Sequence, residues 1–365
     1  MNSPWRAIGW AGGAVGAALA GVVAGTVAQG TRTAARRLDP YAEEPLGALK
    51  PTREFTVAAD DGLPLSAEEV APGGGGEPQV TVVFVHGYTL DRRTWHFQRR
   101  DLARLTDPRV RLVLYDQRSH GRSGRGGADT ATIDQLGRDL AAVLRAAVPE
   151  GPIVLVGHSM GGMTIMALAE QQPELFSDRI CGVALIGTAA GEVGRSGLPR
   201  PVLSSHHLLT LGLGKVAGWR PELVERVRGL GDGVVWNSVR MLAFGDQKIS
   251  PALVDLTANM INGTPVRVIT DYLETLNTHN RYAALAGLRH CEVLVLGGDA
   301  DRLTPFSHSE VIAAELPDAE LVRASGAGHM VMLEQPDLVT HHLAELLRRC
   351  AVKRTERRRR WWRRA

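Results

Sequence analysis

Gly157-His158-Ser159-Met160-Gly161-Gly162 is the stretch of this sequence that decides the fold. It fits the pattern G-x-S-x-G, follows the apolar run 153–156, and opens a helical pattern at 160–172. A strand that turns sharply into a helix holds the middle residue in a strained conformation, and small neighbours let the chain segments approach closely. Ser159 is therefore predicted to stand exposed at a helix N-terminus, where free N–H groups favour a developing negative charge.

Further apolar, β-branched runs surround this motif and predict a sheet that is buried on both faces. The runs are 80–85, 110–115, 153–156, 180–186, 293–296 and, more weakly, 319–323. Helical patterns alternate with them at 95–105, 133–148, 160–172, 307–315 and 337–349. Strands that alternate with helices indicate a mainly parallel sheet covered by helices. Residues 53–57 and 65–70 precede this series and alternate around Asp61-Gly62, which predicts a hairpin.

A serine hydroxyl needs a base to become a good nucleophile, and the base needs a carboxylate to orient it. In α/β proteins with this serine motif, the chain order is serine, acid, histidine. Asp299 and Asp301 follow the predicted strand 293–296, and His329 ends the glycine-rich loop after the next strand. All of them are expected at the carboxyl ends of strands, the same sheet edge as Ser159.

These features together resemble the α/β-hydrolase superfamily, particularly its lid-bearing serine esterase, lipase and haloperoxidase-like branch. The resemblance covers residues 53–350 and rests on five motifs. They are His86-Gly87-Tyr88, Asp116-Gln117-Arg118-Ser119-His120-Gly121-Arg122-Ser123, the Ser159 motif, Gly298-Asp299-Ala300-Asp301-Arg302-Leu303-Thr304-Pro305 and Gly328-His329.

The resemblance implies a role for individual residues. The family pattern G-x-x-D-x-x-T-P favours Asp301 over Asp299 as the acid of a triad with Ser159 and His329. Backbone N–H groups of Tyr88 and Met160 are expected to form the oxyanion hole. In addition, His86 is expected to brace the loop before Tyr88, Asp299 to be a helper or turn residue, and Asp116–Ser123 to shape the edge of the site.

The predicted chemistry is hydrolysis of a carboxylic ester or a related acyl bond through an acyl-enzyme, without a metal or an organic cofactor. A serine nucleophile argues against epoxide hydrolases and haloalkane dehalogenases, which use a carboxylate at this place in the same fold. The motifs do not separate an esterase from an acyltransferase, a thioesterase, an amidase or a C–C hydrolase on the same triad. A non-catalytic ligand-binding member of the fold also stays open, because fold alone does not prove activity.

Residues 191–280 break the alternation, because they contain helical patterns and no convincing strand. The clearest of these patterns are 221–227, 251–261 and 266–276. We predict a helical lid here, inserted into a core formed by residues 53–190 and 281–350. The remaining segments are a membrane helix in 1–30, a linker in 31–52 and a basic tail in 351–365.

The two ends of the chain carry its positive charge. Residues 1–37 contain four arginines and no acid, and residues 353–364 contain eight basic residues and Glu356, although the whole chain carries only +3. The body between them is therefore acidic, which argues against nucleic acid as a partner and for ends that contact anionic lipid.

Residues 7–29 are uncharged and rich in Ala, Gly and Val, long enough to span a bilayer. The alternatives are a secretory signal and a soluble N-terminal extension. If the segment is an anchor, the distribution of arginines places the body in the cytoplasm. The tail, with Trp361-Trp362 among its arginines, is either a disordered charged terminus or an interfacial contact. We expect a small-molecule or lipid-like acyl substrate.

Two other features are expected to be structural. The three cysteines, Cys181, Cys291 and Cys350, are widely spaced and odd in number, which is typical of free thiols rather than a disulfide framework. His206-His207 has no third ligand at a suitable spacing, so a surface or packing pair is favoured over a metal site.

Overall fold

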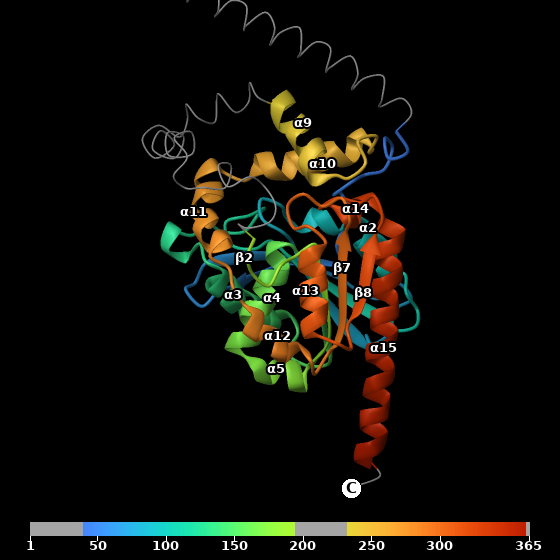
Figure 1. Cartoon of the computed structure of the whole chain (residues 1–365). Coiled ribbons are helices and arrows are strands. Elements are labelled where there is room, and N and C mark those ends of the chain that lie inside the picture. The colour runs from blue at the N-terminus through green and yellow to red at the C-terminus, as the bar shows by residue number, and fades with distance from the viewer. Residues whose placement is uncertain (1–38, 194–231, 363–365) are drawn as a thin grey trace, which may run out of the picture.

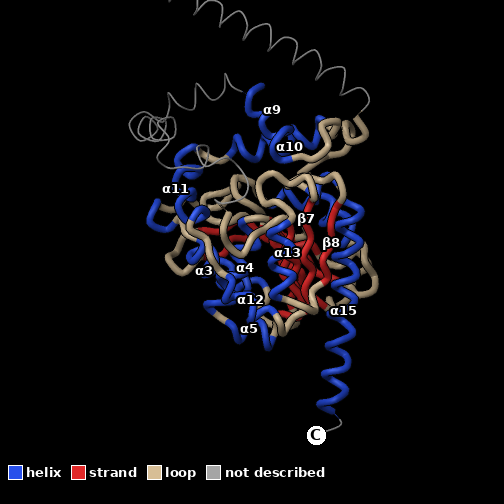
Figure 2. The backbone as a smooth tube through the Cα atoms, viewed as in Figure 1, coloured by secondary structure: helices blue, strands red, loops and turns tan. Residues whose placement is uncertain are grey.

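A single twisted sheet runs through the body of the protein. The structure is a computed structural model that describes residues 39–193 and 232–362. In this part of the chain eight strands lie in the order β1-β2-β4-β3-β5-β6-β7-β8 (Figures 1 and 2). Their bounds are β1 Arg53–Ala58, β2 Pro64–Val70, β3 Val80–Val85, β4 Val110–Tyr115, β5 Ile153–His158, β6 Ile180–Ile186, β7 Glu292–Gly298 and β8 Glu320–Ala324.

The sheet is mostly parallel. β2 is antiparallel to both β1 and β4, and the other neighbouring strands pair in parallel. The sequence therefore predicted the α/β-hydrolase fold class correctly, including the hairpin at its start. The predicted strand 153–156 continues to His158, directly before the serine.

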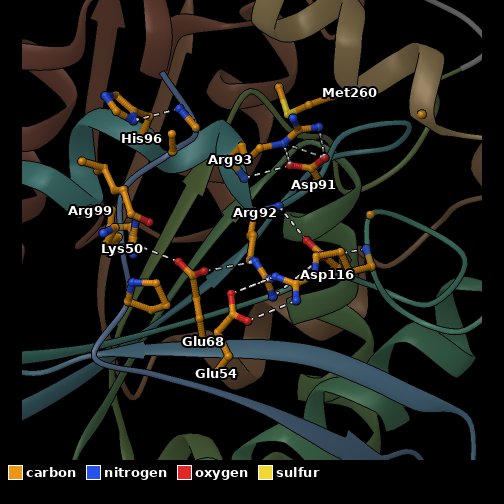
Figure 3. Close-up of a pocket in the computed structure, with 17 residues that line it drawn as sticks. Lys50, Glu54, Glu68, Asp91, Arg92, Arg93, His96, Arg99, Asp116 and Met260 are labelled. Atoms are coloured by element: carbon orange, nitrogen blue, oxygen red, sulfur yellow. Dashed lines mark hydrogen bonds and ion pairs between the residues drawn. The ribbon is translucent and has the colours of Figure 1, made fainter. Parts of the chain in front are cut away.

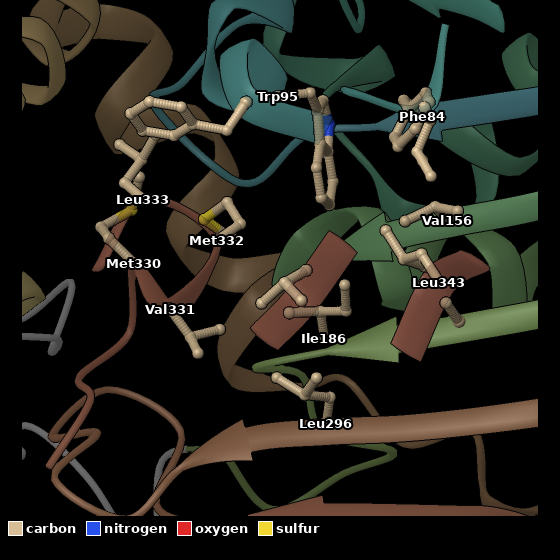
Figure 4. Close-up of a cluster of buried hydrophobic side chains, with 14 of the residues drawn as sticks. Phe84, Trp95, Val156, Ile186, Leu296, Met330, Val331, Met332, Leu333 and Leu343 are labelled. Carbon is tan, nitrogen blue, oxygen red and sulfur yellow. The ribbon is translucent and has the colours of Figure 1, made fainter. Parts of the chain in front are cut away.

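Successive side chains of the central strands enter two different apolar clusters, as the two-residue period of a strand requires. Val82 and Phe84 of β3 pack with residues of α2, α14 and α15 on one face, whereas Val83 and Val85 pack with residues of α3, α4 and α12 on the other. Figure 4 shows the first cluster, in which Trp95 lies over Phe84 with ring centroids 5.1 Å apart. Both faces are buried, which explains why these strands are continuously apolar.

Helices fill the connections between the strands. They are η1 Arg92–Trp95, α2 His96–Leu102, η2 Ala128–Thr130, α3 Ile133–Ala147, α4 Met160–Gln171, α5 Pro173–Asp178, α9 Asp232–Ala243, α10 Pro251–Gly263, α11 Val266–Asn277, η3 Tyr282–Ala284, α12 Leu285–Leu288, α13 Ser307–Glu315, α14 Val331–Glu334 and α15 Pro336–Trp362. α9, α10 and α11 belong to the predicted lid, and Figure 1 shows them on the side toward which β7 and β8 point. The helical pattern at 221–227 lies outside the described residues.

The C-terminal helix is longer than the sequence predicted. The sequence predicted a helix over 337–349 followed by a separate tail, whereas α15 continues to Trp362 and projects beyond the body (Figure 1). Arg and Lys are good helix formers, so the basic run continues the helix instead of ending it. The predicted membrane segment at 7–29 lies outside the described residues. In the parts that the structure describes, no helix is both long enough and apolar enough to cross a bilayer.

Candidate active site

Ser159 occupies the turn between β5 and α4, and its backbone is in a conformation that non-glycine residues rarely adopt. Its φ is 51° and its ψ is −118°, a type of strain that concentrates at functional sites. Two hydrogen bonds hold this turn in place. Ser159 N–H donates to the Ile186 carbonyl at 2.9 Å, and the Thr188 hydroxyl donates to the Ser159 carbonyl at 2.7 Å. The residue is partly buried, so it is less exposed than the sequence predicted.

Glycines beside the turn allow other segments to approach it. A Cβ atom at Gly161 would lie well within 3.0 Å of the Val85 carbonyl, a separation that real Cβ atoms do not adopt. A Cβ at Gly87 would lie 3.2 Å from the Cβ of Ser159. The loop after β3 therefore passes directly beside the serine, and this contact requires glycine.

Asp301 and His329 form a hydrogen-bonded pair at the ends of β7 and β8. The distance from Asp301 Oδ2 to His329 Nδ1 is 2.8 Å, and both side chains are buried. The other carboxylate oxygen, Oδ1, accepts from Leu303 N–H at 2.8 Å and Thr304 N–H at 2.9 Å. Burial by itself would raise the pKa of Asp301, but the interaction with His329 and these hydrogen bonds lower it. The carboxylate is therefore held in its charged form beside the imidazole.

The Thr304 hydroxyl joins this pair to the strand next to β7. Its Oγ1 lies 2.9 Å from the Gly187 carbonyl, 2.9 Å from Asp301 Oδ2 and 3.2 Å from His329 Nδ1. Thr304 belongs to the motif that singled out Asp301, but its contact with both members of the pair was not predicted. The family pattern G-x-x-D-x-x-T-P has threonine at this position, and this was the feature of the sequence that could have indicated the contact.

His158 connects His329 to the serine turn. Its Nε2–H donates to the His329 carbonyl at 3.0 Å, and the two ring centroids are 4.7 Å apart. Complete burial holds the pKa of His158 well below its usual range, so this ring is neutral. No hydrogen bond joins the Ser159 hydroxyl to His329, both of which lie in the described part of the chain. Such bonds commonly tighten only when substrate binds.

The two expected oxyanion donors belong to two segments beside Ser159, the start of α4 and the loop after β3. Met160 is the first residue of α4, where backbone N–H groups have no partner within the helix. Tyr88 follows Gly87 in the loop that contacts Ser159. The Tyr88 hydroxyl donates to the Ile269 carbonyl of α11, so this loop is attached to the predicted lid. Sequence reasoning placed the backbone of Tyr88 at the site but gave no signal for this contact.

Two other residues of the motifs have clear structural partners. His86 Nε2 accepts from Gln117 N–H at 2.9 Å, and the Gln117 side chain donates to the His86 carbonyl at 2.6 Å. His86 therefore braces the loop before Tyr88. Asp299 Oδ1 accepts from Gly326 N–H at 2.6 Å, which links the loop after β7 to the loop after β8 that leads to His329.

Within residues 39–193 and 232–362, no three His, Cys, Asp or Glu side chains are grouped so that they could hold a metal ion. The pair His206-His207 lies outside the described residues. Cys181, Cys291 and Cys350 form no disulfide bond in the described part of the chain.

The chain is similar to several known proteins. The profile of the family described as "alpha/beta hydrolase fold" matches residues 80–336. The uncharacterized hydrolase YugF of Bacillus subtilis is 25% identical, covering 82% of this chain and 99% of YugF. The sn-1-specific diacylglycerol lipase ABHD11 of Mus musculus is 26% identical, over 72% of this chain and 80% of that protein.

Solved structures show the same similarity. A thermophilic esterase from Thermogutta terrifontis superposes with a TM-score of 0.63 at 26% identity, covering 82% of this chain and 100% of the esterase. A bromoperoxidase from Bacillus anthracis, at 18% identity and a TM-score of 0.62 over 81% of this chain and 99% of its own, shares the fold. The family profile covers well over half of the sequence, and the chain therefore belongs to the α/β-hydrolase family.

Proposed function

We propose that this protein is a serine hydrolase that cleaves a carboxylic ester or a related acyl bond. Ser159 is the nucleophile, His329 the base and Asp301 the residue that orients the base. The observation that carries the proposal is the buried Asp301–His329 pair, 2.8 Å apart, whose backbone is hydrogen-bonded to the residue before Ser159. Nucleophilic acyl chemistry requires a serine and an oriented histidine, and here a strained serine and such a histidine follow strands of the same sheet.

The proposed reaction has two halves. His329 Nε2 accepts the proton of the Ser159 hydroxyl while Oγ attacks the acyl carbon, and the backbone N–H groups of Met160 and Tyr88 stabilise the oxyanion. The protonated His329 then donates its proton to the leaving alkoxide, which leaves an acyl-serine. In the second half His329 takes a proton from water, the hydroxide attacks the acyl-serine, and the acid departs as Ser159 recovers its proton.

Similar proteins support acyl chemistry without fixing the substrate. They include proteins named as an esterase and a diacylglycerol lipase, but also an epoxide hydrolase of Caenorhabditis elegans at 22% identity. The serine at position 159 favours an acyl substrate over an epoxide, because epoxide opening in this fold uses a carboxylate nucleophile. Acyl transfer, thioester, amide and C–C bond cleavage use the same triad and remain the alternatives, together with ligand binding without catalysis.

A panel of p-nitrophenyl esters of increasing acyl length tests the proposal. The wild-type chain is expected to release p-nitrophenol with an initial burst if the acyl-enzyme accumulates. Ser159→Ala is expected to lose activity by on the order of 10⁴-fold or more. Ser177→Ala is the matched control, because Ser177 lies on α5 and its hydroxyl donates only locally, to the Glu174 carbonyl and to Asp178. Hydrolysis that survives in Ser159→Ala contradicts the proposed nucleophile.

We also propose that the ends of the chain bring the enzyme to an anionic membrane surface. The support is the charge of residues 353–364 and the continuation of α15 away from the body (Figure 1). A chain that ends at residue 352 and one that begins at residue 39 separate the contributions of the two ends. Sedimentation with phosphatidylserine vesicles is expected to fall for each. Full-length protein that stays in the supernatant rules this proposal out.

A further inference from the structure

A pocket lies beside α2, and its lining does not include the proposed catalytic triad. It has a volume of about 570 Å³, within the range of small-molecule sites. The N-terminal segment 47–51, the strands β1 and β2, the η1–α2 stretch, the loop after β4 and the end of α10 form its walls (Figure 3). None of Ser159, Asp301 and His329 lines it. The proposed hydrolysis therefore leaves it without a role.

Charged side chains dominate the lining of this pocket. Five cations and four carboxylates contribute to it, and they are Lys50, Arg92, Arg93, Arg99, Arg122, Glu54, Glu68, Asp91 and Asp116. Burial lowers the pKa of His96, which also lines the pocket, although Glu44 partly offsets this effect. The histidine therefore adds little positive charge at neutral pH.

Two of the carboxylates each form a bidentate ion pair with one arginine. Asp91 accepts from Nε of Arg93 through both oxygens, at 2.9 and 3.1 Å, and from Nη2 at 2.7 Å. Glu54 accepts from the two terminal nitrogens of Arg122 at 2.8 and 3.1 Å. Each of these two arginines already makes the bidentate contact that a guanidinium group can form with a carboxylate. These four side chains are therefore already paired with one another.

The other two carboxylates, Glu68 and Asp116, are also buried, and both lie near the guanidinium group of Arg92. Asp116 accepts the backbone N–H groups of Arg92 and Arg122, both at 2.9 Å. Glu68 lies between two guanidinium groups, 3.2 Å from Arg92 Nε and 3.0 Å from Arg99 Nε, as Figure 3 shows. One carboxylate is therefore shared by two buried guanidinium groups.

The groups in this pocket that can still form a hydrogen bond are therefore donors. Arg99 is 7% exposed, and its Nη2 is buried without a hydrogen-bond partner, although its Nη1 donates to the Leu49 carbonyl at 2.7 Å. Lys50, one residue after Leu49, forms no ion pair with any residue that the structure describes. A buried guanidinium N–H without a partner costs about 1–3 kcal/mol, so such a group usually has a hydrogen-bond partner, either ordered water or a ligand.

We infer that this pocket binds the carboxylate of a small organic acid beside Arg99 and Lys50, the two cations of its lining that have spare donors. The surplus of one cation over the carboxylates matches a monoanion better than a phosphate dianion. Arg99 supplies a planar donor that fits a carboxylate oxygen, and Lys50 supplies a mobile point charge at the more exposed end. The volume leaves room for an organic group beyond the carboxylate. Such an acid belongs to the same chemical class as the products of acyl hydrolysis, but the site does not depend on that activity.

Calorimetric titration of the full chain with benzoate, at constant ionic strength, tests the inference. Benzamide is the matched ligand control, because it has nearly the same shape without the charge. We expect saturable binding of benzoate, no measurable binding of benzamide, and weaker binding of inorganic phosphate. Lys50→Glu is expected to weaken benzoate binding at least about tenfold, since a charge-assisted contact becomes a repulsion.

Control variants separate this pocket from other places where benzoate could bind. Lys248→Glu makes the same charge change at an exposed lysine outside the pocket and is expected to leave the affinity within about twofold of the wild type. Arg99→Lys keeps the charge but removes the free Nη2, and is expected to weaken binding about tenfold, with thermal melting as the check on folding.

Three outcomes overturn the inference. The first is that wild-type protein shows no saturable binding of benzoate, which would leave water as the partner of Arg99. The second is equal affinity in wild type and Lys50→Glu, which would place benzoate elsewhere, including at the serine. The third is tighter binding of phosphate than of benzoate, which contradicts a site for a monoanion.

Discussion

Asp299 and Asp301 are only two residues apart, yet their side chains serve different neighbours. Asp301 Oδ2 accepts from His329 Nδ1, whereas Asp299 Oδ1 caps the turn at Gly326. The order of the residues along the chain and their position after a predicted strand left both carboxylates as candidates for the acid of the triad. The motif that includes Thr304 favoured Asp301, and the hydroxyl of Thr304 is 2.9 Å from that carboxylate. The physical reason for the motif is therefore the set of hydrogen bonds that fixes the acid.

Exchanging each aspartate for asparagine separates their roles. Asp301→Asn is expected to lower kcat/KM for an ester by about 10³–10⁴-fold, because the amide no longer stabilises the correct tautomer and the imidazolium. Asp299→Asn preserves an acceptor for Gly326 N–H and is expected to stay within about tenfold of the wild type. Steady-state kinetics on one ester measures both. A larger loss in Asp299→Asn than in Asp301→Asn would reverse the assignment.

Thr304 offers a finer test of the same pair. Thr304→Val keeps the shape but removes the hydroxyl that contacts Gly187, Asp301 and His329. Loss of one buried hydrogen bond of this kind corresponds to roughly tenfold in rate. Thr304→Ser retains the hydroxyl and is expected to keep most of the activity. If valine and serine behave alike, the hydroxyl has no positioning role.

At the scale of elements, the strand–turn–helix unit was predictable because its constraints are local. The apolar run of β5, the small residues around Ser159 and the helical pattern of α4 lie within twenty residues of one another. The contact between the Tyr88 hydroxyl and the Ile269 carbonyl was not predictable, because it joins residues 181 positions apart. The end of α15 was also missed, because a charged, solvated run has no apolar period and still permits a helix.

Gly161→Ala tests the close approach at the start of α4. The added Cβ would collide with the Val85 carbonyl, and the backbone there cannot move without disturbing β3. We expect a loss of several kcal/mol in the free energy of unfolding, beyond the usual 1–3 kcal/mol of overpacking. Gly287→Ala is the matched control, since its Cβ would meet nothing closer than 3.8 Å. It is expected to be neutral or slightly stabilising. Urea unfolding of both variants decides the matter, and equal stability would contradict the packing described at Gly161.

For the whole molecule, buried neutral histidines set how the fold responds to acid. Burial lowers the pKa of His120 to about 3 and that of His279 to about 4. Unfolded histidine titrates near 6.5, so below that pH the unfolded state binds more protons and the folded state loses stability. Between pH 7 and pH 5 each of these two histidines is expected to cost about 2 kcal/mol.

A histidine exchange measures this effect directly. His279→Gln keeps a donor for the Ala189 carbonyl, which His279 Nε2 contacts at 3.1 Å. Its free energy of unfolding is expected to fall about 2 kcal/mol less than that of the wild type between pH 7 and pH 5. His290→Gln, at an exposed position, is expected to follow the wild type. An unchanged pH slope in His279→Gln would show that this histidine is not held neutral.

The most direct test of the central claim is labelling by a fluorophosphonate probe, followed by peptide mapping. An activated serine attacks the phosphorus and becomes covalently labelled, whereas an ordinary hydroxyl does not. We predict one modified residue, Ser159, with no labelling of Ser159→Ala and strongly reduced labelling of His329→Ala. If folded wild-type protein remains unlabelled, or if the label lies on another residue, Ser159 is not an activated nucleophile and the proposed hydrolase mechanism is wrong.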